Sequence, residues 1–330
     1  MKKIIHVALS AVLIALCVAA EAQQPAKVYR IGILLAGPIS PRMQYVEAFR
    51  QGLGKLGYVE GHNFALVIRS AEQGPEQLPD RAAELVRLRV DVILTAAPPA
   101  IQAAQQATRT IPIVMAGHGD PVVAGVVASL ARPGGNITGL SSTAGLEIYG
   151  KRLELLKEVV PKASRIAFLF NPADSDSGTV AARMRETEVA AKALGVQLQA
   201  LEVRSADDFE GAFRAAIKAR AAALLTVDGP LFNTHRTRIV DLAAKNRLPA
   251  MYGFSDFADA GGLMVYGVNL TDLWRRAAIH VDKILKGRKP EDLPVEQPMK
   301  YEFIINLIAA KRIGLTVPPN LLVRADRVIR

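Results

Sequence analysis

Apolar residues along this chain follow two alternating spacings, and the alternation predicts a succession of strands and helices. Residues 28–36 form a mostly apolar run that indicates a buried strand, and residues 43–56 carry apolar positions at helical spacing. The same pair of patterns recurs up to residue 115 and again over 165–286. Short β-branched runs separated by amphipathic helices are typical of parallel sheets with helices on both faces, so we expect an α/β protein.

The predicted elements fall into two halves of similar size. Strands are expected at 28–36, 64–69, 90–94, 111–115, 165–170, 196–203, 222–227, 249–252 and 263–266. Helices are expected at 43–56, 76–88, 99–108, 181–194, 206–219, 231–246 and 270–286. No long linker separates the halves, and the Gly/Pro-rich stretch at 132–139 is the best candidate for the first crossing between them.

The N-terminus has the pattern of a secretory signal peptide. Lys2 and Lys3 precede an apolar run over 4–20, and Ala20-Glu21-Ala22 offers a small-residue site for cleavage after Ala22. The run is shorter than the roughly 20 residues that span a bilayer, which favours export over a retained anchor. Lipidation at Cys17 is a third possibility, which we rank lower because Leu16 is bulky for the position before a lipidated cysteine. We expect a periplasmic protein.

The cysteine content and the net charge of the chain narrow the classes of molecule that it is expected to bind. Removing residues 1–22 from the 330 leaves 308 residues without a cysteine and lowers the formal charge from +10 to +9, so stability must come from a large core, usually in two domains. Export argues against nucleic acid as a partner. The basic pairs at 151–152, 275–276 and 311–312 lie in amphipathic helical patterns and are interpreted as solvated faces. An anionic membrane surface or another protein of the compartment suits this charge better.

The sequence contains few motifs that are typical of enzymes, and those present lie in the wrong structural context. Gly52-Leu-Gly54-Lys-Leu-Gly57 has the letters of a dinucleotide fingerprint, but it lies at the far end of a predicted helix instead of between a strand and a helix start. His118 and the other histidines lack the spacing of metal-ligand pairs, and no nucleophile elbow or phosphate loop is present. We therefore predict no catalytic residue, no metal and no cofactor.

Loops at the carboxyl ends of the predicted strands are the candidate site, because open α/β sheets bind ligands there. Six such loops lead into helices, whose N-terminal N–H groups can bind an anionic group. Small and polar residues in them can also be simple helix caps. The candidate ligand-binding residues are Gly37, Ser40, Thr95, Ala96, Asp120, Asn171, Ser175, Asp228, Phe232 and Phe254.

Several strings resemble a known family, the substrate-binding proteins of ABC importers with the type I periplasmic-binding fold, in the group that includes tryptophan- and tyrosine-binding lipoproteins. The matching strings are Phe49-Arg-Gln-Gly-Leu53, Leu56-Gly-Tyr-Val-Glu-Gly61, Asp120-Pro-Val122, 129–140, Ala260-Gly-Gly-Leu-Met264, Val281-Asp-Lys-Ile-Leu-Lys-Gly287 and Asp292-Leu-Pro-Val-Glu-Gln-Pro298. The resemblance covers nearly the whole chain after residue 22. It implies two three-layer αβα lobes with parallel sheets, joined by three crossovers, with the ligand between them.

The resemblance also implies boundaries and roles. Lobe 1 is expected at 27–143 and 269–298, and lobe 2 at 144–268 and 299–330. In relatives that bind aromatic amino acids, a hydroxyl near Thr95 and an acidic residue near Asp228 hold the ligand's two charged ends.

The function implied is capture of an amino acid or related small solute by a monomer, followed by delivery to an ABC permease, without turnover. A secreted enzyme on the same scaffold and a sensor that presents its closed form to a membrane receptor remain the alternatives.

Overall fold

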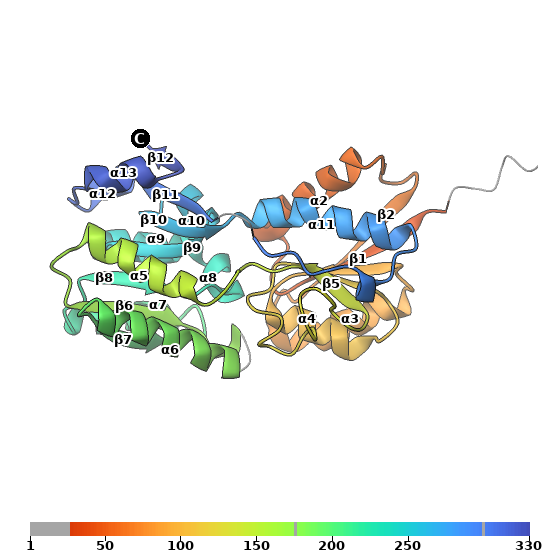
Figure 1. The fold of residues 1–330 in the computed structure, drawn as a ribbon, viewed down its shortest axis with the longest axis horizontal. Coiled ribbons are helices and arrows are strands. Elements are labelled where there is room, and N and C mark those ends of the chain that lie inside the picture. Colours follow the sequence, from red (N-terminus) through yellow and green to blue (C-terminus); the bar gives the residue numbers. More distant parts are fainter. Residues whose placement is uncertain (1–26, 175–176, 299–300) are drawn as a thin grey trace, which may run out of the picture.

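The computed structural model describes residues 27–174, 177–298 and 301–330. The predicted signal peptide with Cys17, and the candidate Ser175, lie outside the described residues. Figure 1 shows two α/β lobes side by side, with the C-terminus on the lobe formed mostly by the second half of the chain. Each lobe is built on its own sheet, one of five strands and one of seven.

Lobe 1 contains the five-stranded sheet, whose order is β2-β1-β3-β4-β5 and whose neighbours are all parallel. Its strands are β1 (Tyr29–Leu35), β2 (Phe64–Ser70), β3 (Val92–Thr95), β4 (Ile113–Ala116) and β5 (Ile137–Leu140). Its helices are η1 (Ser40–Arg42), α2 (Met43–Lys55), η2 (Pro75–Gln77), α3 (Leu78–Arg87), α4 (Pro98–Ala107), α11 (Leu270–Leu285) and η4 (Pro290–Asp292).

Alternation of side chains along β1 accounts for the three layers of lobe 1. Successive residues of a strand point to opposite faces of the sheet. Ile31 and Ile33 join the apolar cluster that includes Phe49 of α2 and Val281 of α11, whereas Leu34 joins the cluster that includes Leu85 of α3 and Ile101 of α4. Both faces of the sheet are therefore covered by helices, as the near-continuous apolar run at 28–36 requires.

Lobe 2 contains the seven-stranded sheet in the order β12-β11-β10-β9-β8-β6-β7. Its strands are β6 (Arg165–Phe170), β7 (Gln197–Glu202), β8 (Ala223–Thr226), β9 (Ala250–Phe254), β10 (Met264–Val268), β11 (Glu302–Asn306) and β12 (Arg327–Ile329). Its helices are α5 (Glu147–Val159), η3 (Pro172–Asp174), α6 (Ser177–Ala193), α7 (Asp208–Lys218), α8 (Pro230–Thr234), α9 (Arg236–Lys245), α10 (Asp256–Asp259), α12 (Leu307–Arg312) and α13 (Pro319–Arg324).

The same alternation builds lobe 2. In β6, Ile166 and Phe168 pack in the cluster that contains the apolar residues of α5, and Ala167 and Leu169 pack in the cluster that contains Phe209 of α7. The expected fold class, two three-layer α/β lobes with parallel sheets, is confirmed with one exception. Strand β11 runs antiparallel to β10, because the chain returns from lobe 1 and enters this sheet from the opposite end.

The described chain passes between the two sheets three times: after β5, before α11 and after η4. The prediction that 132–139 forms the first crossing is wrong, since residues 137–140 form β5 and pair with β4. The last crossing lies against the first, because the backbone of Ser141 donates to the Glu296 carbonyl at 2.8 Å and the Thr138 hydroxyl donates to the Leu293 carbonyl at 2.6 Å. The crossovers are therefore bound to one another beside lobe 1.

Other differences from the sequence prediction are local. The helix expected at 231–246 is two helices, α8 and α9, which meet at His235. Gly54 and Gly57 lie at the end of α2 and just beyond it, so they are far from any strand-to-helix turn. Among the described helices, none is both long enough and apolar enough to cross a membrane.

Candidate functional site

A cavity lies between the two lobes, at the carboxyl ends of strands from both sheets. Its walls come from β1, the start of α4 and α11 in lobe 1, and from α5, α6, α8 and the end of β9 in lobe 2. Its volume is about 100 Å³ on the scale on which one buried water needs roughly 10–15 Å³, so it can hold a small organic molecule. Most of its surface is apolar.

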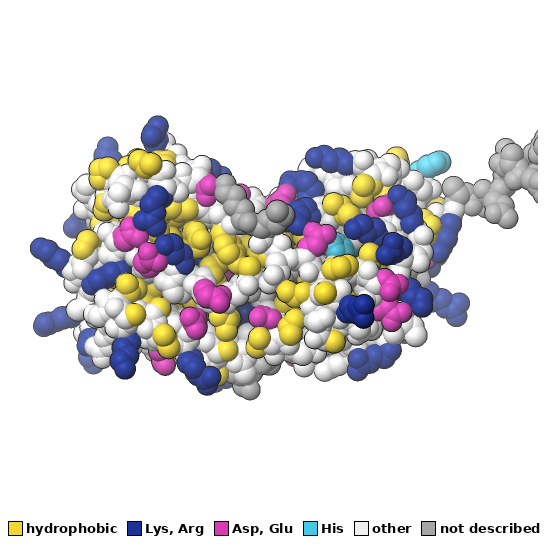
Figure 2. Space-filling view, viewed as in Figure 1, with side chains coloured by type: hydrophobic (Ala, Val, Ile, Leu, Met, Phe, Trp, Pro, Cys, Tyr) yellow, Lys and Arg dark blue, Asp and Glu magenta, His cyan; other side chains and the backbone are white. Residues whose placement is uncertain are grey.

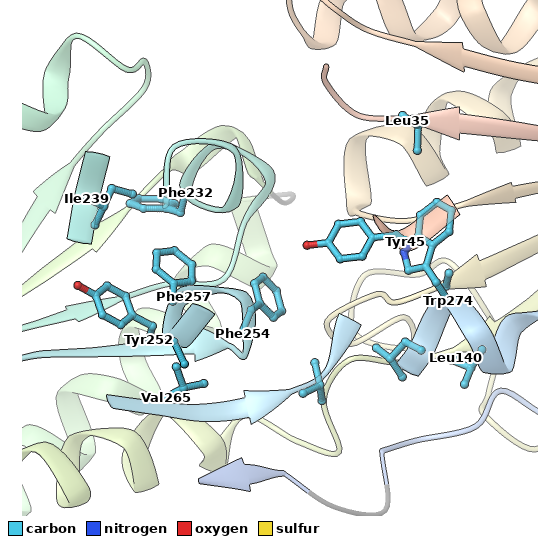
Figure 3. Packing of buried hydrophobic residues seen from close by; sticks show 14 of the residues in the cluster. Leu35, Tyr45, Leu140, Phe232, Ile239, Tyr252, Phe254, Phe257, Val265 and Trp274 are labelled. Carbon is cyan, nitrogen blue, oxygen red and sulfur yellow. The ribbon is translucent and has the colours of Figure 1, made fainter. Parts of the chain in front are cut away.

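Aromatic side chains form one wall of the cavity and come from both lobes. Tyr45 of α2 stacks on Trp274 of α11 with ring centroids 6.0 Å apart and planes inclined by 26°. Phe254, at the end of β9, faces them from lobe 2 (Figure 3). These rings belong to one continuous buried apolar cluster that includes residues of both lobes. An apolar or aromatic ligand body would find complementary surface here.

A buried ion pair supports the lobe 2 side of the cavity. Arg152 of α5 has a side chain only 1% exposed, and its Nη1 lies 2.9 Å from Oδ2 of Asp228, which is 20% exposed. Its Nε also donates to the Tyr266 carbonyl at 2.7 Å. The interpretation of the pair 151–152 as a solvated face is therefore wrong for Arg152, whose long side chain reaches inward across the ends of β9 and β10. Oδ1 of Asp228 is buried and has no hydrogen-bond partner among the described residues.

Two further arginines line the cavity. Arg42 donates to the Pro38 carbonyl at 3.0 Å and across the cleft to Oγ1 of Thr234 at 2.8 Å. Burial of this guanidinium lowers the pKa of Arg42. Arg183 of α6 is 6% exposed and points between Tyr149 and the lobe 1 residue Gly119. Both cations are thus taken out of water at the cavity wall.

Polar contacts join the lobes next to the cavity and define a closed arrangement. The Tyr45 hydroxyl donates to Oδ1 of Asp256 at 2.7 Å and accepts from Nδ2 of Asn233 at 2.8 Å. Nε2 of Gln44 donates to the same carboxylate oxygen at 2.6 Å. Burial raises the pKa of the Asp256 carboxyl and the pKa of the Tyr45 hydroxyl. These contacts lie between α2 of lobe 1 and α8 and α10 of lobe 2, so opening the lobes would break them.

Three of the residues proposed from sequence line the cavity: Ala96, Asp228 and Phe254. Ala96 follows β3, Asp228 lies between β8 and α8, and Phe254 ends β9. They come from both lobes and from loops that the sequence placed at carboxyl strand ends. The structure therefore brings these three together, although Asp228 is already paired with Arg152.

Other residues proposed from sequence lie outside the cavity wall. The Thr95 hydroxyl is buried and donates to the Leu34 carbonyl at 2.9 Å, so it links two strands and does not face the cavity. Asp120 accepts from the backbone of Val122 and Val123 at 3.1 Å, as a turn cap does. Phe232 is core, packed against Phe209 at 5.9 Å.

The remaining candidates serve local structure. Gly37 lies under the guanidinium of Arg42, and its carbonyl accepts from the Ser70 hydroxyl at 3.2 Å. Ser40 begins η1. The Asn171 side chain accepts from the backbone of Ala173 at 2.9 Å.

The sequence did not indicate the aromatic, arginine and asparagine side chains that reach the cavity from helices: Arg42, Tyr45, Tyr149, Arg183, Asn233 and Trp274. One signal was available for Arg183. Thr179, Arg183 and Thr187 are spaced by four residues and are all buried, so they lie along one inward face of α6. A cation in such a row differs from the solvated charges elsewhere, which Figure 2 shows scattered over the visible face of both lobes.

No group of three or more His, Cys, Asp or Glu residues is placed to hold a metal ion within the part of the chain that the structure describes. The chemistry of the cavity wall is therefore that of aromatic rings, guanidinium groups and one paired carboxylate.

The chain is similar in sequence to proteins of one known family. A model of the family described as ABC transporter substrate binding protein matches residues 36–329. A relative described as a tyrosine-binding protein of Clostridioides difficile is 26% identical over 266 residues, which cover 79% of this chain and 73% of the relative.

Two solved structures share the fold over 92% of this chain and 100% of theirs. A conserved domain protein from Vibrio cholerae gives a TM-score of 0.84 at 25% identity. An ABC domain from Streptococcus pneumonia, in complex with L-Trp, gives a TM-score of 0.83 at 23% identity.

Proposed function

We propose that this chain, which belongs to the family of ABC transporter substrate-binding proteins, captures a small organic solute between its lobes and delivers it to an ABC permease. The cavity between the lobes, with hydrogen bonds across the cleft beside it, carries this proposal. Its wall supplies an apolar surface and a few convergent polar groups, the composition expected of a ligand site. The protein binds its solute without turnover.

Relatives that bind tyrosine or L-tryptophan support an amino acid or a related small acid as the solute. Phe254 packs against the apolar body of the ligand, the backbone at Ala96 closes the lobe 1 side, and the carboxylate of Asp228 accepts a hydrogen bond from the ligand. Each of these residues lines the cavity. The lobes act as the domains expected from sequence, 27–143 with 269–298 and 144–268 with 299–330.

Export places this function in the periplasm. Cleavage after Ala22 gives a mature chain that begins at Gln23, and the protein acts as a monomer that meets its permease at the membrane. Solute capture works by rotation of the lobes about their crossovers, because a ligand that contacts both lobes favours the closed form by its difference in affinity between the two forms.

A thermal-shift panel of amino acids and small carboxylic acids tests the function. At least one solute should raise the melting temperature, since binding to the folded state alone stabilises it. Ala96→Trp should abolish that shift by filling the cavity, whereas Ala193→Trp, at an exposed position of α6 outside the cavity, should retain it. A shift of equal size in Ala96→Trp would place binding elsewhere, and a panel without any shift would contradict solute capture.

A further inference from the structure

The charges that face the cavity do not balance. Among the described residues, the charged side chains that line it are Arg42, Arg183 and Asp228. Asp228 is neutralised by Arg152, which lies behind it at 2.9 Å and is almost completely buried. The described wall of the cavity therefore carries two guanidinium groups and no carboxylate that is free of an arginine partner, which gives this wall a net positive charge.

Arg42 already has structural partners. Its guanidinium donates to the carbonyl oxygens of Pro38 and Ala36 and to the hydroxyl of Thr234. These contacts hold it at the cleft between the lobes. Its charge contributes to the potential of the cavity, but its hydrogen-bond donors are largely used.

Arg183 differs from Arg42 in the part of the chain whose side chains the structure describes. Within residues 27–173, 178–298 and 301–330, no carboxylate lies within salt-bridge distance of Arg183, and no group accepts a hydrogen bond from its guanidinium. Its Cζ lies 6.0 Å from the centroid of the Tyr149 ring, and the residue is only 6% exposed. A buried cation without an anion is costly, and a planar guanidinium binds a carboxylate with two parallel hydrogen bonds. Arg183 lines the cavity, so a carboxylate of the ligand could supply this anion.

Gly119 provides the space for this guanidinium. A Cβ atom at Gly119 would lie 2.5 Å from Nη2 of Arg183, so any other residue there would displace the arginine tip. Gly119 belongs to lobe 1 and α6 to lobe 2, which means that the tip of Arg183 crosses the cleft in the closed form. A ligand carboxylate bound to it would connect the two lobes.

On the premise of the proposed function, we propose that the solute is an aromatic or other apolar carboxylic acid whose carboxylate binds Arg183, and that an ammonium group is not required. Asp228 and Arg152 form a neutral pair, which can accept a hydrogen bond from a hydroxyl or an amine but gives little attraction for a positive charge. The apolar body lies against Tyr45, Trp274 and Phe254. The site thus discriminates by the carboxylate, and amino acids are one subset of what it accepts.

Calorimetric titration with two matched series of probes tests the proposal. The first series is L-tryptophan, indole-3-propanoate and tryptamine, and the second is L-phenylalanine, 3-phenylpropanoate and 2-phenylethylamine. Within each series the probes keep one aromatic body and lose either the amine or the carboxylate. The propanoate of at least one series should bind, and the corresponding amine should bind at least about 30-fold more weakly, the loss expected when a buried charge pair is broken.

Variants connect this preference to Arg183. Arg183→Gln should weaken propanoate binding by about 30-fold or more, and Gly119→Ala should weaken it in the same direction by displacing the guanidinium. Arg185→Gln, on the exposed face of the same helix, is the matched control and should leave the affinity unchanged. Circular dichroism melting of each variant separates loss of binding from loss of folding. If Arg183→Gln unfolds, Gly119→Ala still tests the contact, because it retains the arginine residue and only displaces its guanidinium.

The outcomes distinguish the two proposals. Tighter binding of an amine than of its propanoate, or unchanged propanoate affinity in both Arg183→Gln and Gly119→Ala, would overturn the role of Arg183. Absence of binding by all six probes would also overturn it, while any thermal shift that depends on Ala96 would leave solute capture standing. Failure of the whole panel would contradict the function itself.

Discussion

Replacing Arg152 by leucine should lower the free energy of unfolding by about 3 kcal/mol, the low end of the loss expected when one partner of a buried ion pair is removed. The guanidinium is 1% exposed and binds Asp228, the Tyr266 carbonyl and the Gly253 carbonyl at 2.9, 2.7 and 3.4 Å. Leucine would leave the Asp228 carboxylate without its partner. Urea denaturation followed by circular dichroism measures the change.

Lys151→Ala is the matched control on the same helix. Lys151 pairs with Glu154 in water, at 37% and 46% side-chain exposure, so its loss should cost less than about 0.5 kcal/mol. The double variant Arg152→Leu with Asp228→Asn should be less destabilised than the sum of the two single variants, because the two residues are coupled. Additive losses, or a loss below about 1 kcal/mol for Arg152→Leu, would contradict a structural ion pair.

Gly253→Ala should destabilise the protein by about 2–3 kcal/mol, the cost of forcing an additional methyl group into a filled interior. Its Cβ would overlap Oδ1 of Asp228 and lie 2.6 Å from Nη2 of Arg152, so the ion pair could not keep its place. Ligand affinity should fall as well, because Asp228 lines the cavity. Thermal and urea denaturation measure the first effect, and calorimetry the second.

Gly211→Ala is a control that should change the free energy of unfolding in the opposite direction. Gly211 lies within α7, and the nearest atom to its added Cβ would be Nη2 of Arg214 at 3.9 Å. Alanine there should stabilise the protein by about 0.5–1 kcal/mol through its higher helix propensity. If Gly253→Ala stabilised the protein as Gly211→Ala does, the predicted steric clash of a Cβ atom at Gly253 with Asp228 and Arg152 would be contradicted.

Much of the fold was predictable because burial on both faces leaves a clear pattern. The apolar run at 28–36 contains β1, and helical spacing at 43–56 places α2 almost to the residue. Strand β5 was missed because its four residues include Gly139 and follow Pro133 and two glycines, which indicate a turn more strongly than Ile137 and Thr138 indicate a strand. Strand β11 was missed because its pairing depends on a distant crossover.

The cavity was less predictable than the sheets. Loops that follow parallel strands have a fixed direction, so Ala96, Asp228 and Phe254 could be placed at the cleft from topology alone. Each helix that reaches the cavity lines it with only a few side chains on one of its faces. Which face points into the cleft depends on how the two lobes pack together. Arg152 shows this most clearly, because Arg152 is buried while its neighbour Lys151 is partly exposed. Nothing local in the sequence separates the two.

Small-angle X-ray scattering of the mature chain, with and without the solute that gives the largest thermal shift, tests the central claim most directly. The structure has the lobes joined by Tyr45–Asp256, Gln44–Asp256 and Arg42–Thr234 hydrogen bonds beside the cavity. Rotation of the lobes around a bound solute predicts a smaller radius of gyration at saturating solute than in its absence, and no change for Ala96→Trp under the same conditions. An unchanged radius in the parent protein at saturating solute would contradict capture by closure of the lobes.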